Sequence, residues 1–325
     1  MITSKLQRRK SGQTRFFPEI AISCSRELQN LGFSADVFLI PGGLGVRFLS
    51  DRQFSNLSNL SHLPIRELDF SKVCSFDPEH IQSFSLEALS LPKGCTLPFR
   101  EFKRFKLKRL SAVQSQSTDF ESLAILPIEE LNLSGCSTQN LSFTHSMPLT
   151  KLDLSGTNLL DLRPLAEKPL EKLFLQNSKV ENLSPLADCP LEELNLNKTL
   201  ISDLAPLRGS PLRNLELRKT EVNDLGPLME SPLENLTLPG SPIFSIAPLT
   251  YCPLKNLNLI GLGLDDLSPL KEMQLTSLSI SPLELNIEDF LLLNEINTSY
   301  LIGPGDDPKQ TVKQFMDKYS NHKDQ

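Results

Sequence analysis

The feature that most constrains this chain is a sequence repeat with a period of 21 residues. The segment PLEKLFLQNSKVENLSPLADC (169–189) is followed directly by PLEELNLNKTLISDLAPLRGS (190–210), and then by PLRNLELRKTEVNDLGPLMES (211–231). The same register gives eleven units, which start at 64, 85, 106, 127, 148, 169, 190, 211, 232, 253 and 274. A unit this short cannot bury its own apolar side chains, so neighbouring units must stack to form one continuous core. The period therefore predicts a solenoid.

Apolar residues occupy fixed positions in every unit. The second position is Ile or Leu, the fifth is Leu, and the seventh is apolar throughout. This alternation is typical of a short strand with one buried side. Stacking then joins the strands into a parallel sheet. The fifth-position leucines are Leu68, Leu89, Leu110, Leu131, Leu152, Leu173, Leu194, Leu215, Leu236, Leu257 and Leu278.

The later half of each unit predicts a turn instead of a long helix. Sequences such as DLRPL (161–165) and DLAPL (203–207) place an aspartate where it can cap free amides and a proline whose fixed φ starts a tight or 3₁₀ turn. Fourteen of the 24 prolines stand at the first or seventeenth position of a unit. A small polar residue at the tenth position, such as Thr157 or Ser178, is expected to satisfy buried backbone groups. Units 64–126 depart from the later half-motif, with Pro78, Phe99 and Phe120.

The pattern LxxLxLxxT/S resembles the leucine-rich repeat family over about two thirds of the chain. The DLxPL half resembles the short bacterial repeats of internalin-like and planctomycete-like proteins. The resemblance implies a solenoid of the α/β class. Its curved parallel sheet carries short strands, with turns or 3₁₀ segments on the convex side and a cap at each end. It also implies a protein that binds another protein.

The sequence predicts four parts: a basic, disordered head (1–16), an N-terminal cap with one degenerate repeat (17–63), the repeats (64–295) and a C-terminal cap (296–325). Residues 18–30 are expected to form a helix that buries Ile20, Cys24 and Leu28. Residues 37–40 are expected to form a strand. In the register of the repeats, Arg47 takes the place of the key leucine in the degenerate unit.

The C-terminal cap is predicted to contain an amphipathic helix. Asp307, Pro308 and Gln310 have the spacing of its N-cap, first and third positions. An apolar stripe follows and is expected to cover the last repeat; the alternative is a free helix that awaits a partner. The stripe consists of Val312, Phe315, Met316 and Tyr319.

The charge and hydropathy of the chain argue against nucleic acid and membrane as its partners. Residues 1–15 contain five Lys and Arg and no acid, which leaves −11 on the rest of a chain whose net charge is −6. Nucleic-acid binding is therefore not expected, except through this head. No stretch is long and apolar enough for a membrane span or a secretory signal. We expect a cytoplasmic monomer, with non-classical secretion left open.

The sequence contains no recognisable catalytic motif. The four histidines are scattered, and no P-loop or GxSxG motif occurs. The six cysteines show no metal-ligand spacing. The sequence therefore predicts neither an enzyme nor a metal or cofactor site.

Residues at the fourth, sixth and eighth positions of each unit are expected to point away from the core, onto the concave face. Among them Phe174 is an aromatic residue flanked by polar ones, which is typical of an interface anchor. The alternative is that Phe174 packs on the aliphatic stems of its neighbours. Likewise, Asn214, Asn235 and Asn256 form either a structural amide ladder or a row of donors for a ligand. The candidate partner-binding residues are Lys151, Asp153, Lys172, Phe174, Gln176, Glu193, Asn195, Asn214, Glu216 and Arg218.

These observations predict a non-catalytic scaffold that binds a protein partner on its concave face. Two alternatives stay open: a regulatory or targeting partner that acts in trans on a bacterial kinase or other signalling enzyme, and a secreted effector without a classical signal. A kinase or ubiquitin-ligase domain does not fit in the 42 residues before residue 43 or the roughly 30 after the repeats.

Overall fold

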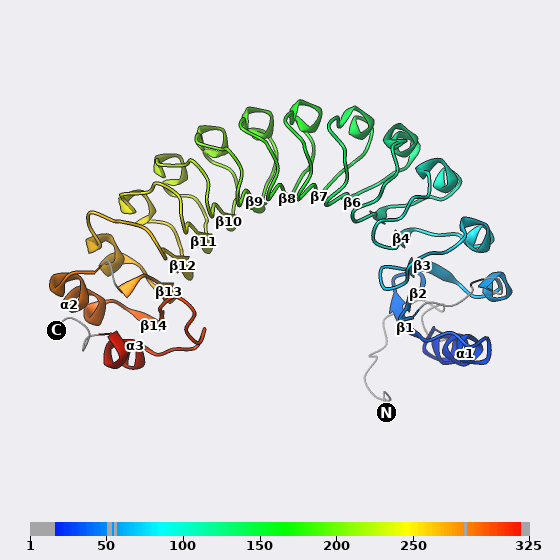
Figure 1. Cartoon of the computed structure of the whole chain (residues 1–325), viewed down its shortest axis with the longest axis horizontal. Helices are drawn as coiled ribbons and strands as arrows, with labels where there is room; N and C mark the ends of the chain where they lie inside the picture. The colour runs from blue at the N-terminus through cyan, green and yellow to red at the C-terminus, as the bar shows by residue number, and fades with distance from the viewer. Residues whose placement is uncertain (1–16, 51–53, 55–56, 283–284, 320–325) are drawn as a thin grey trace, which may run out of the picture.

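The chain forms an open arch with strands along its inner side and short turns along its outer side (Figure 1). The computed structural model describes residues 17–50, 54, 57–282 and 285–319. The predicted basic head of residues 1–16 lies outside the described residues. The first and last described helices, 17–30 and 312–319, lie at opposite ends of the arch, as expected for a solenoid that adds one repeat after another.

Within the described residues, fourteen strands form one sheet in sequence order, and every neighbouring pair is parallel except β1 and β2. The strands are β1 (Ala35–Ile40), β2 (Gly43–Phe48), β3 (Ile65–Asp69), β4 (Ala88–Ser90), β5 (Arg109–Ser111), β6 (Glu130–Asn132), β7 (Lys151–Asp153), β8 (Lys172–Phe174), β9 (Glu193–Asn195), β10 (Asn214–Glu216), β11 (Asn235–Thr237), β12 (Asn256–Asn258), β13 (Leu275–Ser279) and β14 (Thr298–Ile302). The α-helices are α1 (Phe17–Asn30), α2 (Ile287–Glu295) and α3 (Val312–Tyr319).

A 3₁₀ segment follows each of the strands from β3 to β12 on the convex side. Together with one segment before β3, they are η1 (Leu57–Leu60), η2 (Pro78–Ile81), η3 (Phe99–Phe102), η4 (Phe120–Ile125), η5 (Ser142–Thr144), η6 (Arg163–Leu165), η7 (Ser184–Leu186), η8 (Ala205–Leu207), η9 (Gly226–Leu228), η10 (Ala247–Leu249) and η11 (Ser268–Glu272). This curved parallel sheet with 3₁₀ segments confirms the fold class predicted from the repeat.

The predicted columns form the core. Leu173 of β8 lies between Leu152 and Leu194 of the neighbouring strands, and all three side chains are fully buried. Burying one leucine side chain contributes roughly 1.5–3 kcal/mol. The core therefore stabilises the stack only because each leucine is covered by the units on both sides.

The turns satisfy backbone groups as the sequence predicts. The carboxylates of Asp161 and Asp203 accept hydrogen bonds from the amides of Arg163 and Ala205, at the start of η6 and η8. At the tenth position, the buried hydroxyl of Thr157 donates to the carbonyl of Leu154 at 2.7 Å. Ser178 departs from the prediction, because its buried hydroxyl has no hydrogen-bond partner in the described structure. Asp161, Asp203 and Thr157 therefore have the structural role expected of their columns, and Ser178 does not.

The N-terminal end is covered by α1, which begins one residue earlier than predicted and buries Cys24 and Leu28. Ile20, the third residue expected to be buried, is partly buried against the core. The chain then turns at Gly42, whose φ of +80° is in the left-handed region that favours glycine. The β1–β2 hairpin that results places β2 alongside the first regular repeat.

The predicted register of the degenerate repeat is wrong by one residue. Strand β2 carries an irregularity between Leu44 and Gly45, so that Val46, not Arg47, aligns with the key leucine Leu68. Val46 and Phe48 are consequently buried. The physical reason is that a buried position needs an apolar side chain, so the strand shifts and leaves the arginine outside.

Phe48, the last residue of β2, belongs to an aromatic cluster in the core. Its ring stacks on Phe70 with centroids 5.0 Å apart, and Phe54 meets both rings edge to face. Such pairs contribute beyond their buried area. Leu49, which the register of the repeats would place at the apolar seventh position, is instead 37% exposed because of the register shift.

The C-terminal helix begins later than predicted. Asp307 does not cap it; the carboxylate of Asp307 accepts from the amide of Lys309 in a preceding turn. Helix α3 starts at Val312, and Thr311 and Gln314 exchange the hydrogen bonds of a capping box before it. The delay has a tertiary cause, since Tyr300 of β14 forms a bridge with Thr311 that a helix starting at 308 would prevent.

The apolar stripe of α3 covers the end of the array. Phe315 is fully buried, and its ring contacts Tyr319 with centroids 4.8 Å apart. Helix α3 also packs against β14. The helix is therefore part of the core and not a free helix. Sequence reasoning missed α2, whose capping box joins Asn286 and Asp289.

Candidate protein-binding face

The concave face is built from side chains on either side of each central leucine. In strands of three residues such as β8, Leu173 points into the core while Lys172 and Phe174 are half-buried on the inner side of the arch. The strands end at the sixth position. The eighth-position residues, expected on the face, lie beyond the strand ends in the turn, and Ser155 is buried there with a hydrogen bond to Asp153.

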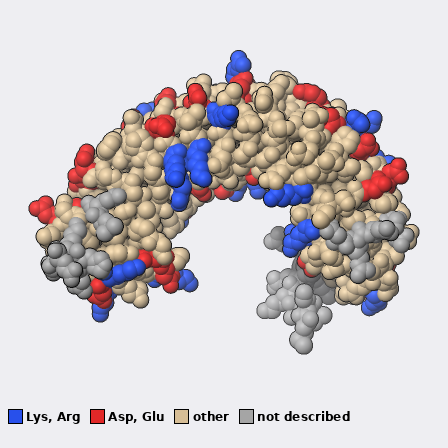
Figure 2. All heavy atoms as spheres, viewed as in Figure 1, with Lys and Arg blue, Asp and Glu red and all other residues tan. Residues whose placement is uncertain are grey.

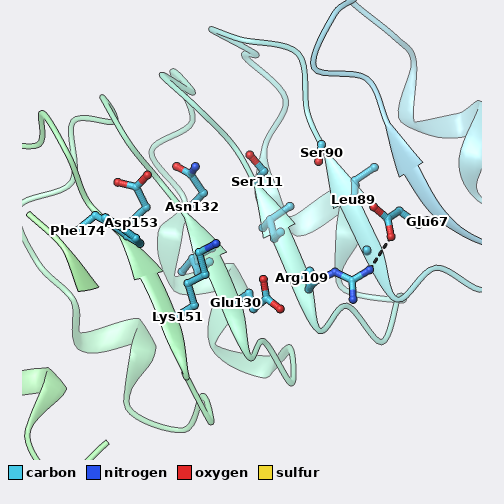
Figure 3. A pocket seen from close by; sticks show the side chains of 13 residues that line it. Glu67, Leu89, Ser90, Arg109, Ser111, Glu130, Asn132, Lys151, Asp153 and Phe174 are labelled. Carbon is cyan, nitrogen blue, oxygen red and sulfur yellow. Dashed lines mark hydrogen bonds and ion pairs between the residues drawn. The ribbon is translucent and has the colours of Figure 1, made fainter. Parts of the chain in front are cut away.

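A shallow hollow of about 350 Å³ lies on this face between β3 and β8. The small side chains Ala88, Ser90 and Ser111 leave room between longer ones on neighbouring strands. Figure 3 shows Phe174, Asp153 and Lys151 toward one end of the hollow and Glu67 at the other. Its remaining lining comprises Leu89, Arg109, Leu110, Glu130, Leu131 and Asn132.

An ion pair crosses the hollow near β4. The guanidinium of Arg109 donates to the carboxylate of Glu67 at 2.5 Å, although a whole repeat lies between them (Figure 3). The contact forms because Ala88, on the intervening strand, is too short to block it. Both side chains are partly exposed, at 45% and 21%, so the pair adds little to stability. Breaking this ion pair therefore costs little free energy.

Phe174 lies at the edge of the hollow. In the sheet it is aligned with Asp153 on one side and Asn195 on the other, as the register of the repeats predicts. The ammonium of Lys151 lies 6.0 Å from the centre of its ring, at the limit of a cation–π contact. Part of the ring therefore packs on a neighbour, while the half-exposed remainder faces the hollow.

The ten candidate residues divide into two groups. Lys151, Asp153 and Phe174 line the hollow; the other seven do not. Those seven are Lys172, Gln176, Glu193, Asn195, Asn214, Glu216 and Arg218, which lie on or just after β8, β9 and β10.

Side chains of the second group mostly bind one another. Lys172 donates to Glu193 at 2.9 Å, and this hydrogen bond and the charge of Glu193 raise the pKa of Lys172. The amide of Asn195 donates to Glu216 at 2.9 Å. Two members differ: Arg218 is exposed in the turn, and the buried side-chain oxygen of Gln176 accepts no hydrogen bond in the described structure. Along β9 and β10, polar groups are thus largely satisfied within the protein.

The asparagine column forms a continuous amide ladder. Asn256 donates to Asn235 at 2.6 Å, and Asn235 in turn donates to Asn214. This is the structural arrangement of the two considered from the sequence. The ladder holds β10, β11 and β12 together through side chains as well as backbone.

Sequence reasoning missed the residues on the N-terminal side of the hollow and a row of charges beside it. The hollow could have been predicted from Ala88 and Ser90, because these small residues stand at the fourth and sixth positions, where other units carry longer side chains. The missed row stands at the third position, where Arg66 pairs with Glu87 at 2.6 Å. Farther along, Glu234 accepts from Lys255 and Arg213, which together lower the pKa of Glu234.

The described residues hold most of their cysteines buried in the core and gather no cluster of metal-ligand side chains. Burial raises the pKa of the Cys136 thiol to about 11, so that it stays protonated at neutral pH, and it donates to the carbonyl of Ala112 at 3.1 Å. Within the described residues no three His, Cys, Asp or Glu side chains gather as metal ligands. None of the described helices is both long and apolar enough to cross a membrane.

Comparison with known proteins places the fold. No protein-family model and no curated protein matches the chain. Among solved structures, the chain is similar to the internalin inlF from Listeria monocytogenes, with a TM-score of 0.67, 19% identity and coverage of 82% of this chain and 84% of the other. The internalin C2 structure from the same organism gives a TM-score of 0.50 and 20% identity, over 70% of this chain and 92% of the other. At these identities the likeness is one of fold.

Proposed function

Because this chain is a leucine-rich repeat solenoid, we propose that it is a non-catalytic scaffold that binds a protein partner on its concave face. The hollow between β3 and β8 is the proposed anchoring site, and Phe174 is its proposed anchor. The observation that carries the proposal is a half-exposed aromatic ring at the edge of a hollow on an otherwise polar surface. Interfaces commonly concentrate their binding energy in such aromatic residues, surrounded by polar groups.

The charges around the hollow support a protein partner with mixed polarity. The carboxylate of Glu130 forms no ion pair in the described part of the chain, whereas Arg109 is held by Glu67. A partner that places an apolar side chain against Phe174 can also offer a donor to Glu130 and compete for Arg109. Surface charges of this kind affect the rate and specificity of association more than its strength.

The test compares the chain carrying Phe174→Asp with the wild type in an affinity pulldown analysed by mass spectrometry. Phe244→Asp is the matched control, because Phe244 is 57% exposed and lies outside the strands. We expect Phe174→Asp to abolish recovery of the partner and Phe244→Asp to retain it. Phe174→Asn is a second variant that avoids placing two acids side by side, since asparagine stands at the same position in β6 and β9.

Two outcomes would contradict the proposal. Recovery of the same partner with Phe174→Asp and Phe174→Asn would show that Phe174 is not the anchor. Loss of the partner together with a thermal unfolding temperature far below that of wild type, for both variants, would assign the residue to the fold. Circular dichroism of each purified variant distinguishes these cases.

We also propose the four-part division predicted from the sequence, with 17–63 and 296–325 as caps and 64–295 as repeats. Its support is that Leu28 of α1 and Phe315 of α3 are buried at opposite ends of the core. Covered ends favour a monomer, because an open end would expose both apolar side chains and backbone groups. Light scattering after size-exclusion chromatography tests the monomer directly.

The proposed compartment is the cytoplasm. Cys24, Cys95, Cys136, Cys189 and Cys252 are buried as thiols in the core, an arrangement suited to a reducing environment. Cell fractionation with a specific antibody tests this assignment, and recovery of the protein from the culture medium would contradict it.

A further inference from the structure

The turn after each strand contains a residue in the left-handed region of backbone space. In eight consecutive units the ninth residue has a φ between +54° and +76°. Glycine or asparagine accepts this conformation readily, whereas other side chains crowd the following carbonyl. Five of these residues are Gly or Asn, and two adjacent ones are lysines. The eight are Gln114, Gly135, Gly156, Asn177, Lys198, Lys219, Gly240 and Gly261.

The two lysines and an arginine form one surface, which we term the basic cluster (Lys198, Arg218 and Lys219). The amide of Lys198 donates to the carbonyl of Arg218 at 2.7 Å, so the two turns lie against each other. All three residues are exposed. Figure 2 shows Lys and Arg side chains side by side over β9 and β10, on the flank of the arch.

The cations of the basic cluster differ from three cations of the neighbouring repeats. Lys172, Arg213 and Lys255 are paired with carboxylates on neighbouring repeats. No described carboxylate lies within ion-pair distance of the basic cluster. Three unpaired cations thus stand together on a chain whose net charge is −6.

The surroundings of the basic cluster are suited to a polypeptide. Leu200, two residues after Lys198 and just beyond the turn, is 51% exposed and offers an apolar side chain next to the cluster along the chain. Beside Lys219, a Cβ atom on Gly240 would come within 3.1 Å of the Cγ atom of the lysine. The glycine therefore gives the stem of Lys219 a flat surface to lie on, which leaves its ammonium outward.

We propose that the basic cluster docks an acidic, extended segment of a protein partner. A segment with two or three carboxylates can reach these cations at short range, and a leucine-sized side chain can contact Leu200. A nucleic acid is disfavoured, because a long polyanion also meets the net negative charge of the whole body. The proposal is independent of the hollow and stands even if the hollow binds nothing.

The experiment is a fluorescence-anisotropy titration of the full chain with a labelled peptide in which Glu, Asp and Leu alternate. The variant is the double substitution Lys198→Asn with Lys219→Asn, which removes two charges and installs the residue that the same turn uses at Asn177. The matched control is Gln114→Asn, which changes the same turn position in another repeat without removing a charge. A peptide with Gln and Asn in place of the acids controls for the apolar contribution.

We expect the double variant to bind the acidic peptide about tenfold more weakly, and Gln114→Asn to bind like wild type. Affinity for wild type should fall as salt rises. The unfolding temperature of the double variant should not fall, since asparagine accepts the left-handed turn better than lysine. Phe174→Asn should leave peptide binding unchanged, which separates this test from that of the hollow.

Three results would overturn the proposal. These are failure of wild type to bind the acidic peptide above the uncharged one, equal binding by the double variant, and tighter binding of a single-stranded oligonucleotide of the same charge. The last result, if the double variant also loses oligonucleotide binding, would assign the basic cluster to nucleic acid; if the double variant keeps it, the oligonucleotide binds elsewhere, and the cluster still fails as the strongest site for a polyanion.

Discussion

The two halves of the concave face share one backbone and use their side chains differently. Between β3 and β8, small residues such as Ala88 and Ser111 open a hollow at which Phe174 remains half-exposed. From β9 to β12, Asn195, Glu216 and the asparagine ladder bind each other across the strands. A polar group that is already paired has less to gain from a partner than one that is not. Side-chain size at two positions per repeat thus separates a hollowed surface, the proposed binding site, from one whose side chains pair across the strands.

The largest expected effect tests whether the core is equally well packed beneath both halves of the face. Leu173→Ala and Leu236→Ala each shorten a key leucine that is at most 1% exposed, one in each half of the face. Each should lower the free energy of unfolding by about 2–5 kcal/mol, through lost burial and a cavity. Urea unfolding followed by circular dichroism measures both. A cost below about 1 kcal/mol in either half would show that its core is packed less well than the structure indicates.

The next prediction fills the hollow. Ser111→Phe adds a large side chain in the middle of the hollow, whereas Thr237→Phe adds the same side chain at the same repeat position in β11. Partner binding should weaken by about 2 kcal/mol or more in the first variant and change little in the second. Competition between each variant and wild type for the captured partner provides the measurement. Equal weakening by both would extend the binding site over the whole face.

The smallest effect concerns the amide ladder. Asn235→Ala removes one hydrogen bond to Asn214 and one from Asn256, and should destabilise the fold by about 1 kcal/mol because the ladder is partly exposed to water. Ser90→Ala, in the hollow, is the counterpart and should change stability by less than about 0.5 kcal/mol. Thermal unfolding of both variants tests the contrast. A ladder variant as stable as wild type would mean that these amides are equally well satisfied by solvent.

Much of the architecture follows from local spacing. The alternation around Leu173 predicts its strand, and the aspartate and proline of 161–165 predict the 3₁₀ turn that the structure contains. The sequence also identified Phe174 as an aromatic side chain between polar neighbours. These features were predictable because each depends on residues of the same unit or of the next one, which the fixed period places side by side.

Predictions failed where contacts between distant residues outweigh local preference. The pairing of Tyr300 with Thr311 delays the start of α3, although Asp307 and Pro308 have the spacing of a helix start. At the other end, burial of Val46 shifts the register that the repeat assigns to Arg47. The hollow was missed for a similar reason, since the Arg109–Glu67 contact spans two repeats and depends on the absence of a long side chain between them.

The sequence by itself determined the solenoid, its core columns, its turns and the face on which its variable residues stand. Only the tertiary structure decided which of those residues pair with one another and which stay exposed. The tertiary structure also showed the basic cluster, because Lys198 and Arg218 come together only when the turns of two neighbouring repeats stack on each other. The reason is physical: periodicity sets which side chains face the same way, but their reach across neighbouring strands determines which of them pair and which stay exposed.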